Sequence, residues 1–247
     1  MRLLADLGNT RLKCALVEGD RMRARWAGTH AQAEDGLRDW LLREARSIED
    51  IWLAAVAQED VTRVVTTVLR ALGPEPVRVR TRRHALGLTA GYTHVEELGV
   101  DRWLALIAAF RRGLAPCVVA SVGSALTVDA LCVDGRHLGG LIAPTPEAMR
   151  EALFARAPGL PQASGEVADF ATGTADGIQS GCLLAGVALI ERSLSGLERR
   201  IGARPALVVS GGGAAALRPL LGEHAFLPDL VLDGLALLAQ AEPAPSA

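Results

Sequence analysis

Short hydrophobic runs separated by turn residues open the chain. The stretch LLADLGNTRLKCALVEGD, residues 3–20, predicts a strand, a turn around Gly8, and a second strand, and RMRARWAG continues as a third. A second stretch, SVGSALTVDALCVDGR at 121–136, has the same pattern and is followed by RHLGGLIAP. Aligning the two stretches places Gly8 on Gly123 and Asp6 on Ser121. We therefore predict two similar halves, each beginning with a three-stranded meander; the alternative is a chance likeness between two short hairpins.

After each meander the spacing of hydrophobic residues becomes helical. Helices are predicted at 33–47, 59–72, 100–113, 146–157, 175–200 and 227–240. A buried strand is predicted at 50–57, a short strand at 75–81, and a strand that runs into glycines at 204–212. The last residues, AEPAPSA, are typical of a frayed tail. Strands that alternate with helices predict an α/β fold with mixed sheets. The loop signal RRGLAP sets the expected boundary, giving domains at 1–113 and 114–247.

Composition narrows the range of functions. Half of the 247 residues are hydrophobic, and a net charge of −2 gives no electrostatic reason to expect a nucleic-acid partner. Lys13 is the only lysine and lies outside any P-loop motif, which excludes P-loop chemistry. The four cysteines lack metal-binding spacing and suit a reducing compartment, so we expect a cytoplasmic protein. The most apolar stretch, 113–128, is interrupted by Pro116 and Gly123, so no membrane span is expected there.

Glycine turns after apolar strands are candidate phosphate sites. Backbone N–H groups in such turns bind anions, and two of these turns facing each other across a domain cleft would hold the phosphates of a nucleotide. Asp6, at the end of the first strand, would face a magnesium ion on those phosphates, through water. A third cluster, SGGGAA at Ser210, follows a buried strand and lets a ring or phosphate approach the backbone. A single glycine-rich turn of this kind is more often only a turn than a phosphate site.

Asp101 is the candidate for chemistry, in the segment YTHVEELGVDRWLALIAA. Asp101 lies in the first turn of an apolar helix, where a carboxylate commonly caps the helix and is stabilised by its dipole. The functional alternative is that Asp101 accepts the proton of an attacking hydroxyl during phosphoryl transfer. Arg102 would then hold an acidic substrate. Composition alone favours the cap.

Six motifs in order resemble type III pantothenate kinases: DLGNT, LGVDRW, GSALTVD, HLGGLIAP, TGTADGIQSG and SGGG. The resemblance covers almost the whole chain and places it in the acetate and sugar kinase/Hsp70/actin superfamily. It implies two ribonuclease H-like domains with an ATP cleft between them and a homodimer. It also implies Mg²⁺-dependent phosphorylation of pantothenate by ATP, the first step towards coenzyme A.

The resemblance also implies roles for individual residues. Asp101 corresponds to the family's proton acceptor. The implied ATP-binding residues are Asp6, Leu7, Gly8, Asn9, Thr10, Arg11, Leu12, Lys13 and Ser124. The implied pantothenate-binding residues are Tyr92, Gly99, Val100, Asp101, Arg102 and Thr174.

Two positions depart from the family's pattern. Ser121 stands where the family's second phosphate motif usually has an Asp that holds a monovalent cation, K⁺ or NH₄⁺. A hydroxyl is a weaker ligand than a carboxylate, so we expect weak or absent potassium activation. Val95 stands where many members have Pro, which removes no chemical group.

The sequence also allows other functions and other interpretations of several residues. A non-enzymatic regulator on the same fold is one alternative, and a kinase for a sugar or another small hydroxy acid is a second. The five histidines show no metal-ligand spacing, so no protein metal site is expected. The basic run RVRTRRH at Arg78 is either a solvated edge or a region that steers anions. The small residues Gly177, Gly181, Ala185 and Ala188 allow close helix packing, in the core or in a dimer.

Overall fold

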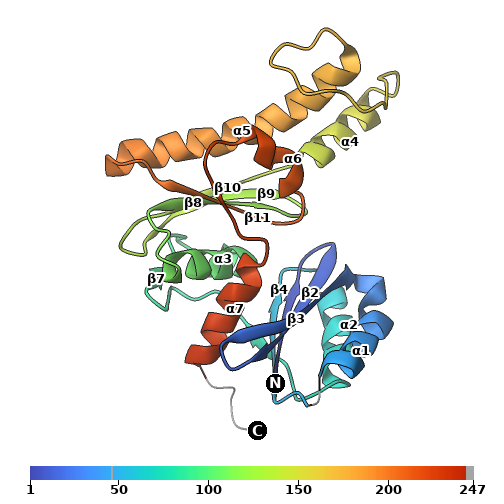
Figure 1. Ribbon diagram of the computed structural model, residues 1–247, viewed down its shortest axis with the longest axis vertical. Helices are drawn as coiled ribbons and strands as arrows, with labels where there is room; N and C mark the ends of the chain where they lie inside the picture. The colour runs from blue at the N-terminus through green and yellow to red at the C-terminus, as the bar shows by residue number, and fades with distance from the viewer. Residues whose placement is uncertain (46, 243–247) are drawn as a thin grey trace. The chain divides into compact units, whose positions relative to one another are not determined.

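The computed structural model describes residues 1–45 and 47–242, and it divides into two compact units. The first unit contains Met1–Arg112 together with the segment that begins at Asp229, and the second is Gly113–Pro228 (Figure 1). Each unit is built on its own five-stranded sheet. Arg46 in the predicted helix 33–47 and most of the predicted tail lie outside the described residues.

The sheet of the first unit has the strand order β3-β2-β1-β4-β5. Its strands are β1 (Arg2–Leu7), β2 (Arg11–Glu18), β3 (Arg21–Thr29), β4 (Asp50–Ala55) and β5 (Val77–Val79). β1, β2 and β3 form the predicted antiparallel meander, whereas β4 and β5 run parallel to β1. β1 is therefore the central strand, with buried apolar side chains on both faces.

Helices cover both faces of this sheet. On one face, α1 (Ala33–Glu44), which follows the short helix η1 (His30–Gln32), and α2 (Glu59–Arg70) enclose a core with Leu3, Ala5 and Leu7 of β1 (Figure 1). The alternate β1 residues, Leu4 and Asp6, point to the opposite face. There α7 (Leu230–Ala241) contacts β1, β2 and β4 and packs along α3 (Val100–Arg111).

The segment between β5 and α3 contains elements that the hydrophobic pattern did not predict. A small hairpin, β6 (His84–Ala85) and β7 (Leu88–Thr89), is followed by the short helix η2 (Val95–Glu97). Gly87 turns the hairpin with φ +89°, and a Cβ there would lie 2.6 Å from the Phe110 ring of α3. The hairpin is thus packed closely on α3.

The second sheet repeats the strand order of the first. Its order is β10-β9-β8-β11-β12, with strands β8 (Cys117–Val122), β9 (Leu126–Leu131), β10 (His137–Ala143), β11 (Ala206–Ser210) and β12 (Ala225–Phe226). Again three antiparallel strands are followed by two parallel ones. The predicted α/β fold with two similar mixed sheets is confirmed, and the aligned residues Asp6 and Ser121 are each the penultimate residue of the first strand.

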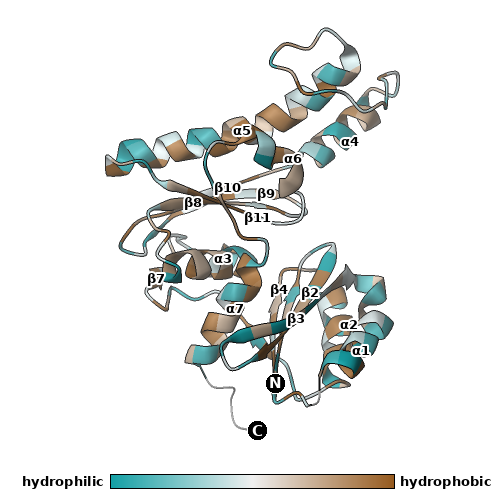
Figure 2. Ribbon diagram, viewed as in Figure 1, coloured by the Kyte–Doolittle hydropathy of each residue, from teal (hydrophilic) through white to brown (hydrophobic). Residues whose placement is uncertain are grey.

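One long helix covers the core of the second unit and contributes four of its buried residues. The helices of this unit are α4 (Pro146–Arg156), α5 (Thr174–Ile201), α6 (Ala214–Leu217) and η3 (Arg218–Leu220). Leu183, Val187 and Ile190 of α5 pack on β8 and β9, and the middle of α5 is strongly hydrophobic in Figure 2. By length and composition α5 is the one described helix that could cross a membrane, but this packing makes it a core helix of the second unit. The apolar stretch 113–128 contains β8, the turns on either side of it and the first three residues of β9.

The grouping of the C-terminal helix differs from the predicted domain ranges. The sequence ranges placed α7 in a domain 114–247, whereas its contacts group it with the first unit. The reason is close packing: a Cβ at Gly234 of α7 would lie 2.0 Å from the carbonyl oxygen of Leu104 in α3. Only glycine permits this approach of the two helices.

Candidate active site

The turn after β1 presents backbone groups beside a carboxylate. Asp6 is in register with Lys13 of β2 and Ala54 of β4. The Gly8 N–H donates to the Arg11 carbonyl over 3.0 Å and closes the turn. Asn9, Thr10 and Arg11 are exposed, so this turn is accessible to a ligand.

Two residues of the predicted ATP-binding stretch have side chains in the core. Leu7 and Leu12 are fully buried and pack against the side of the sheet that α1 and α2 cover. Their side chains cannot contact a phosphate, so any contribution from these two positions comes through the backbone. The polar members of the stretch are Asp6, Asn9, Thr10, Arg11 and Lys13.

Asp101 lies at the start of α3, where Gly99 is the N-cap residue. One oxygen of its carboxylate, Oδ1, accepts a hydrogen bond of 2.8 Å from the Arg102 N–H. A Cβ at Gly99 would lie 2.6 Å from that same oxygen. Glycine therefore makes room for the Asp101 carboxylate to fold back over the helix terminus.

Asp6 and Asp101 interact electrostatically within the first unit. Burial, and to a lesser extent the negative charge of Asp101, raise the pKa of Asp6 to about 7, even though Lys13 partly offsets both effects. Two carboxylates that disfavour each other's charge suit a site where a cation binds. The Mg²⁺ that the family resemblance implies would fit such a site.

Arg102 and Tyr92 form a pair beside Asp101. Arg102 is only 6 % exposed, and its Nη1 donates to the Tyr92 hydroxyl over 2.9 Å. The guanidinium carbon also lies 5.5 Å from the centroid of the Tyr92 ring. Val100 is buried at the same helix end. The first unit thus brings together all the predicted substrate residues except Thr174.

The second unit places two glycine turns side by side. Ser121 of β8 is in register with Ser210 of β11, so the turns that follow these parallel strands are neighbours. The Gly213 N–H donates to the Val122 carbonyl over 3.1 Å. Gly211 has φ +91°, and a Cβ there would lie 2.2 Å from the same carbonyl oxygen. Ser124 is exposed at the tip of the turn after β8.

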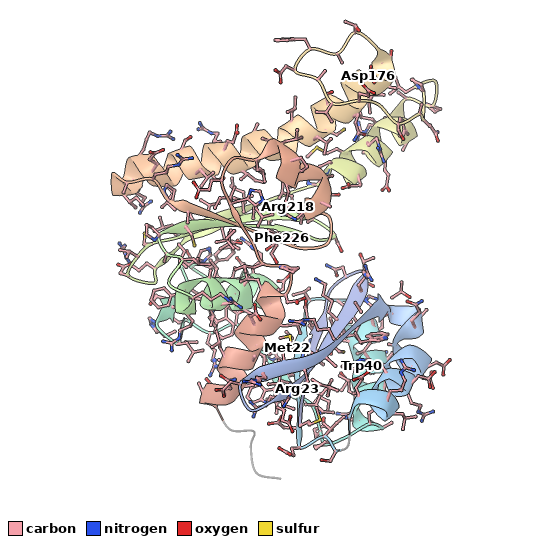
Figure 3. The ribbon with its side chains drawn as sticks, viewed as in Figure 1. Met22, Arg23, Trp40, Asp176, Arg218 and Phe226 are labelled. Carbon is pink, nitrogen blue, oxygen red and sulfur yellow. The ribbon has the colours of Figure 1, made fainter. Side chains whose placement is uncertain are left out.

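Thr174 lies elsewhere in the second unit, as the first residue of α5. It lines an apolar groove of about 710 Å³ between α4 and α5, with Met149, Leu153 and Ile178. The loop before α5 folds back along its first turns. There the Glu166 N–H donates to Asp176 over 2.8 Å and the Ala168 N–H donates to Ser180 over 3.0 Å (Figure 3).

The basic run at 78–84 was expected to be either a solvated edge or a region that steers anions. Arg83 in this run does neither. Arg78 and Arg82 form ion pairs with Glu59 and Glu242, as solvated surface arginines do. Arg83, by contrast, donates to main-chain carbonyl groups of Ala90, Tyr92 and Thr93. No short-range sequence signal identified this contact, because the partners are seven to ten residues away.

Two histidines form polar contacts that support the local structure, a role that the search for metal-ligand spacing could not predict. His30 contacts the Gly8 carbonyl through Nε2 over 2.9 Å and so supports the first turn from η1. His137 is buried and lies 3.0 Å from Asp129. Among residues 1–45 and 47–242, no three His, Cys, Asp or Glu side chains are grouped closely enough to hold a metal ion.

Figure 3 also shows Arg218 beside Phe226, with the guanidinium carbon 4.0 Å from the ring centroid, where η3 packs on β12.

Solved structures share this fold at low sequence identity. A putative Baf family transcriptional activator from Campylobacter jejuni superposes with a TM-score of 0.63 at 19 % identity, covering 98 % of both chains. Component A of (R)-2-hydroxyglutaryl-CoA dehydratase from Acidaminococcus fermentans gives 0.54 at 14 % identity, covering 97 % of this chain and 96 % of the other. At such identities the likeness is one of fold alone.

Sequence comparison is more specific. The family model for type III pantothenate kinase matches residues 2–196. A type III pantothenate kinase from Stenotrophomonas maltophilia strain K279a is 42 % identical over 241 residues, covering 98 % of each chain. One from Xanthomonas oryzae pv. oryzae strain PXO99A is 44 % identical over 243 residues with the same coverage. The chain therefore belongs to the type III pantothenate kinase family.

Proposed function

We propose that this protein transfers the γ-phosphoryl group of ATP to the terminal hydroxyl of pantothenate, the first step towards coenzyme A. The observation that carries the proposal is the Asp6–Asp101 carboxylate pair beside Tyr92 and Arg102, in a chain of this family. Phosphoryl transfer needs a group that accepts the hydroxyl proton and charges that hold the two substrates. The pair and its neighbours supply both.

Asp101 accepts the proton of the attacking hydroxyl. Arg102 binds the pantothenate carboxylate through its buried guanidinium, where a charge-assisted bond is strong. Tyr92 fixes the orientation of Arg102, and Gly99 and Val100 shape the helix end against the substrate. Thr174 contributes a hydroxyl to the same substrate from α5.

ATP binds through backbone N–H groups and small side chains of the turns at 8–13 and 123–127. Ser124 contacts the nucleotide, and the turn at 211–213 supports the second phosphate turn through Val122. Asp6 would hold the Mg²⁺ that accompanies ATP, through water, and the ion would neutralise phosphate charge. A cation there would also offset the repulsion between Asp6 and Asp101.

A monovalent cation contributes little in this chain. Ser121 lies between Ser210 and Thr127 in the sheet register, so neutral hydroxyl-bearing residues flank the position where the family usually carries a carboxylate. The electrostatic attraction for K⁺ or NH₄⁺ is correspondingly weaker.

The protein acts as a homodimer in the cytoplasm, without a nucleic-acid or membrane partner. The apolar groove between α4 and α5, where Leu153 is 41 % exposed, is the surface for the second copy. A large exposed apolar surface of this kind is typical of a protein interface. All four cysteines are free thiols, as a reducing compartment requires.

ADP release by the purified protein tests the reaction. With Mg·ATP present, we expect release that depends on pantothenate and is not supported by glucose, glycerate or acetate. A sugar or another small acid that gave the greater kcat/KM would favour the alternative kinase. Absence of ADP release with every acceptor, in protein that binds ATP, would favour a regulator on the same fold.

A further inference from the structure

Hydrogen bonds from Thr81 and Arg83 hold the proposed substrate segment at both of its ends. This segment, residues 90–98, connects the β6–β7 hairpin to the N-cap of α3. At its C-terminal end the Thr81 hydroxyl donates to the Leu98 carbonyl over 2.7 Å, directly before Gly99. At its N-terminal end the Ala90 N–H donates to the Arg83 carbonyl over 2.9 Å.

The Arg83 side chain adds a second set of bonds at the N-terminal end. Its Nη1 donates to the carbonyls of Ala90, over 3.0 Å, and of Tyr92, and its Nη2 donates to the carbonyl of Thr93 over 2.9 Å. A planar guanidinium with several fixed donors can bind three carbonyls at once, and a lysine ammonium cannot reproduce this geometry. The backbone on both sides of Tyr92 is therefore held by one side chain.

Holding this backbone determines where the Tyr92 side chain lies. The Tyr92 hydroxyl meets Arg102 Nη1 at 2.9 Å, and the ring lies 5.5 Å from the Arg102 guanidinium carbon. Arg102 is the buried cation that binds the pantothenate carboxylate in the proposed reaction. A chain of contacts thus runs from Arg83 through Tyr92 to Arg102.

We propose that Arg83 is a positioning residue that orients Tyr92 against Arg102 and thereby sets the affinity for pantothenate. It acts through main-chain carbonyls and does not contact the substrate. The effect on affinity rests on the proposed function, whereas the orientation of Tyr92 does not. This separation allows the two to be tested independently.

Fluorine NMR tests the orientation without any substrate. Tyr92 is the only tyrosine in the chain, so protein labelled with 3-fluorotyrosine gives a resonance from this residue alone. In Arg83→Lys we expect this resonance to shift or broaden, because the ring is no longer held in one environment. Arg78→Lys is the matched control: it makes the same chemical change at an exposed pair with Glu59 and leaves the resonance in place.

Kinetics test the consequence for the substrate. In Arg83→Lys we expect KM for pantothenate to rise roughly ten- to a hundredfold, the effect of weakening one charge-assisted hydrogen bond. KM for ATP and kcat stay within about twofold, since neither phosphate turn involves Arg83. In a Tyr92→Phe background the same substitution raises KM much less, because its effect passes through the Tyr92 hydroxyl.

The outcomes separate the two claims. An unchanged fluorine resonance in Arg83→Lys overturns the proposal, whether or not the melting temperature falls. A shifted resonance with an unchanged pantothenate KM overturns the link to affinity. If the resonance shifts but wild-type protein does not phosphorylate pantothenate, the proposed function fails while the positioning of Tyr92 by Arg83 stands.

Discussion

Asp6 carries a carboxyl group whose protonation depends on burial and on the charge of Asp101. Its pKa is raised to about 7 in the folded protein, against about 3.8 for the ordinary group. Between these values the folded state keeps a proton that the unfolded state has lost. Raising the pH through this window therefore lowers the free energy of unfolding, and the loss is complete above pH 7.

Asp6→Asn removes this titration. Urea unfolding at pH 5 and pH 8 should show that the wild type loses about 2–4 kcal/mol more stability than the variant over this range. The same variant should also use Mg·ATP less well, with pantothenate affinity little changed. Equal pH dependence in the two proteins would show that Asp6 is ionised throughout.

Ser121 provides a second prediction at the level of one side chain. Because a hydroxyl carries no charge, wild-type activity should change less than about twofold across a potassium series at constant ionic strength. Ser121→Asp should introduce saturable activation by potassium or ammonium. Strong saturable activation of the wild type would show that the cation site survives without the carboxylate.

The turn between β11 and α6 shows how one element supports another. Gly211 has φ +91° and lies against the carbonyl of Val122 at the end of β8, whereas Gly212 has open space around its Cα. Gly211→Ala should cost about 1–3 kcal/mol of stability and weaken Mg·ADP binding, because the methyl group pushes the turn at 211–213 away from the phosphate turn at 123–127. Gly212→Ala should leave both nearly unchanged.

Calorimetry of Mg·ADP binding and urea unfolding check this pair of variants. Equal effects of the two substitutions would mean that the contact with Val122 does not determine the shape of the turn. A loss of stability in Gly211→Ala with unchanged nucleotide affinity would separate the turn from the ATP site.

Sequence patterns predicted the principal elements because these have strong local periodicity. The two meanders, the buried strands and the major helices follow from runs of apolar residues, and the repeat follows from the alignment of Gly8 with Gly123. The β6–β7 hairpin and η2 are too short to give a periodic pattern, with strands of two residues and a helix of three. The grouping of α7 with α3 depends on contact between distant segments at Gly234, which periodicity cannot show.

Some residues of the candidate site could be predicted from the sequence, and others could not. Asp6, Asp101 and Arg102 were found because each stands in a recognisable motif at the end of a strand or the start of a helix. Thr81 and Arg83 were not, because they act on main-chain carbonyls that any residue provides. Contacts of a side chain with the backbone leave no signature in the identity of the partner.

At the scale of the whole molecule, the apolar groove between α4 and α5 predicts self-association. Leu153 is 41 % exposed on this surface, so Leu153→Asp should leave the monomer folded but place a charge in the interface. Sedimentation should find a dimeric wild type and a monomeric variant. Leu42→Asp is the control, because Leu42 is 77 % exposed on α1 of the other unit.

A wild type that is monomeric at micromolar concentration would contradict the dimer, and a dimeric Leu153→Asp would place the interface elsewhere. If the dimer contributes to pantothenate binding near Thr174, the monomeric variant should also have a higher KM for pantothenate. Its affinity for ATP should change little.

The central claim is that Asp101 serves as the base for phosphorylation of pantothenate, and single-turnover ADP formation in Asp101→Asn tests it most directly. The amide keeps the shape of the side chain and can still accept the Arg102 N–H bond, but it cannot take the proton. We predict that the rate of pantothenate-dependent ADP formation falls about 10²–10⁴-fold, while the affinity for Mg·ATP and the melting temperature stay close to those of the wild type. A rate within about threefold of the wild type, with phosphopantothenate formed, would contradict the account.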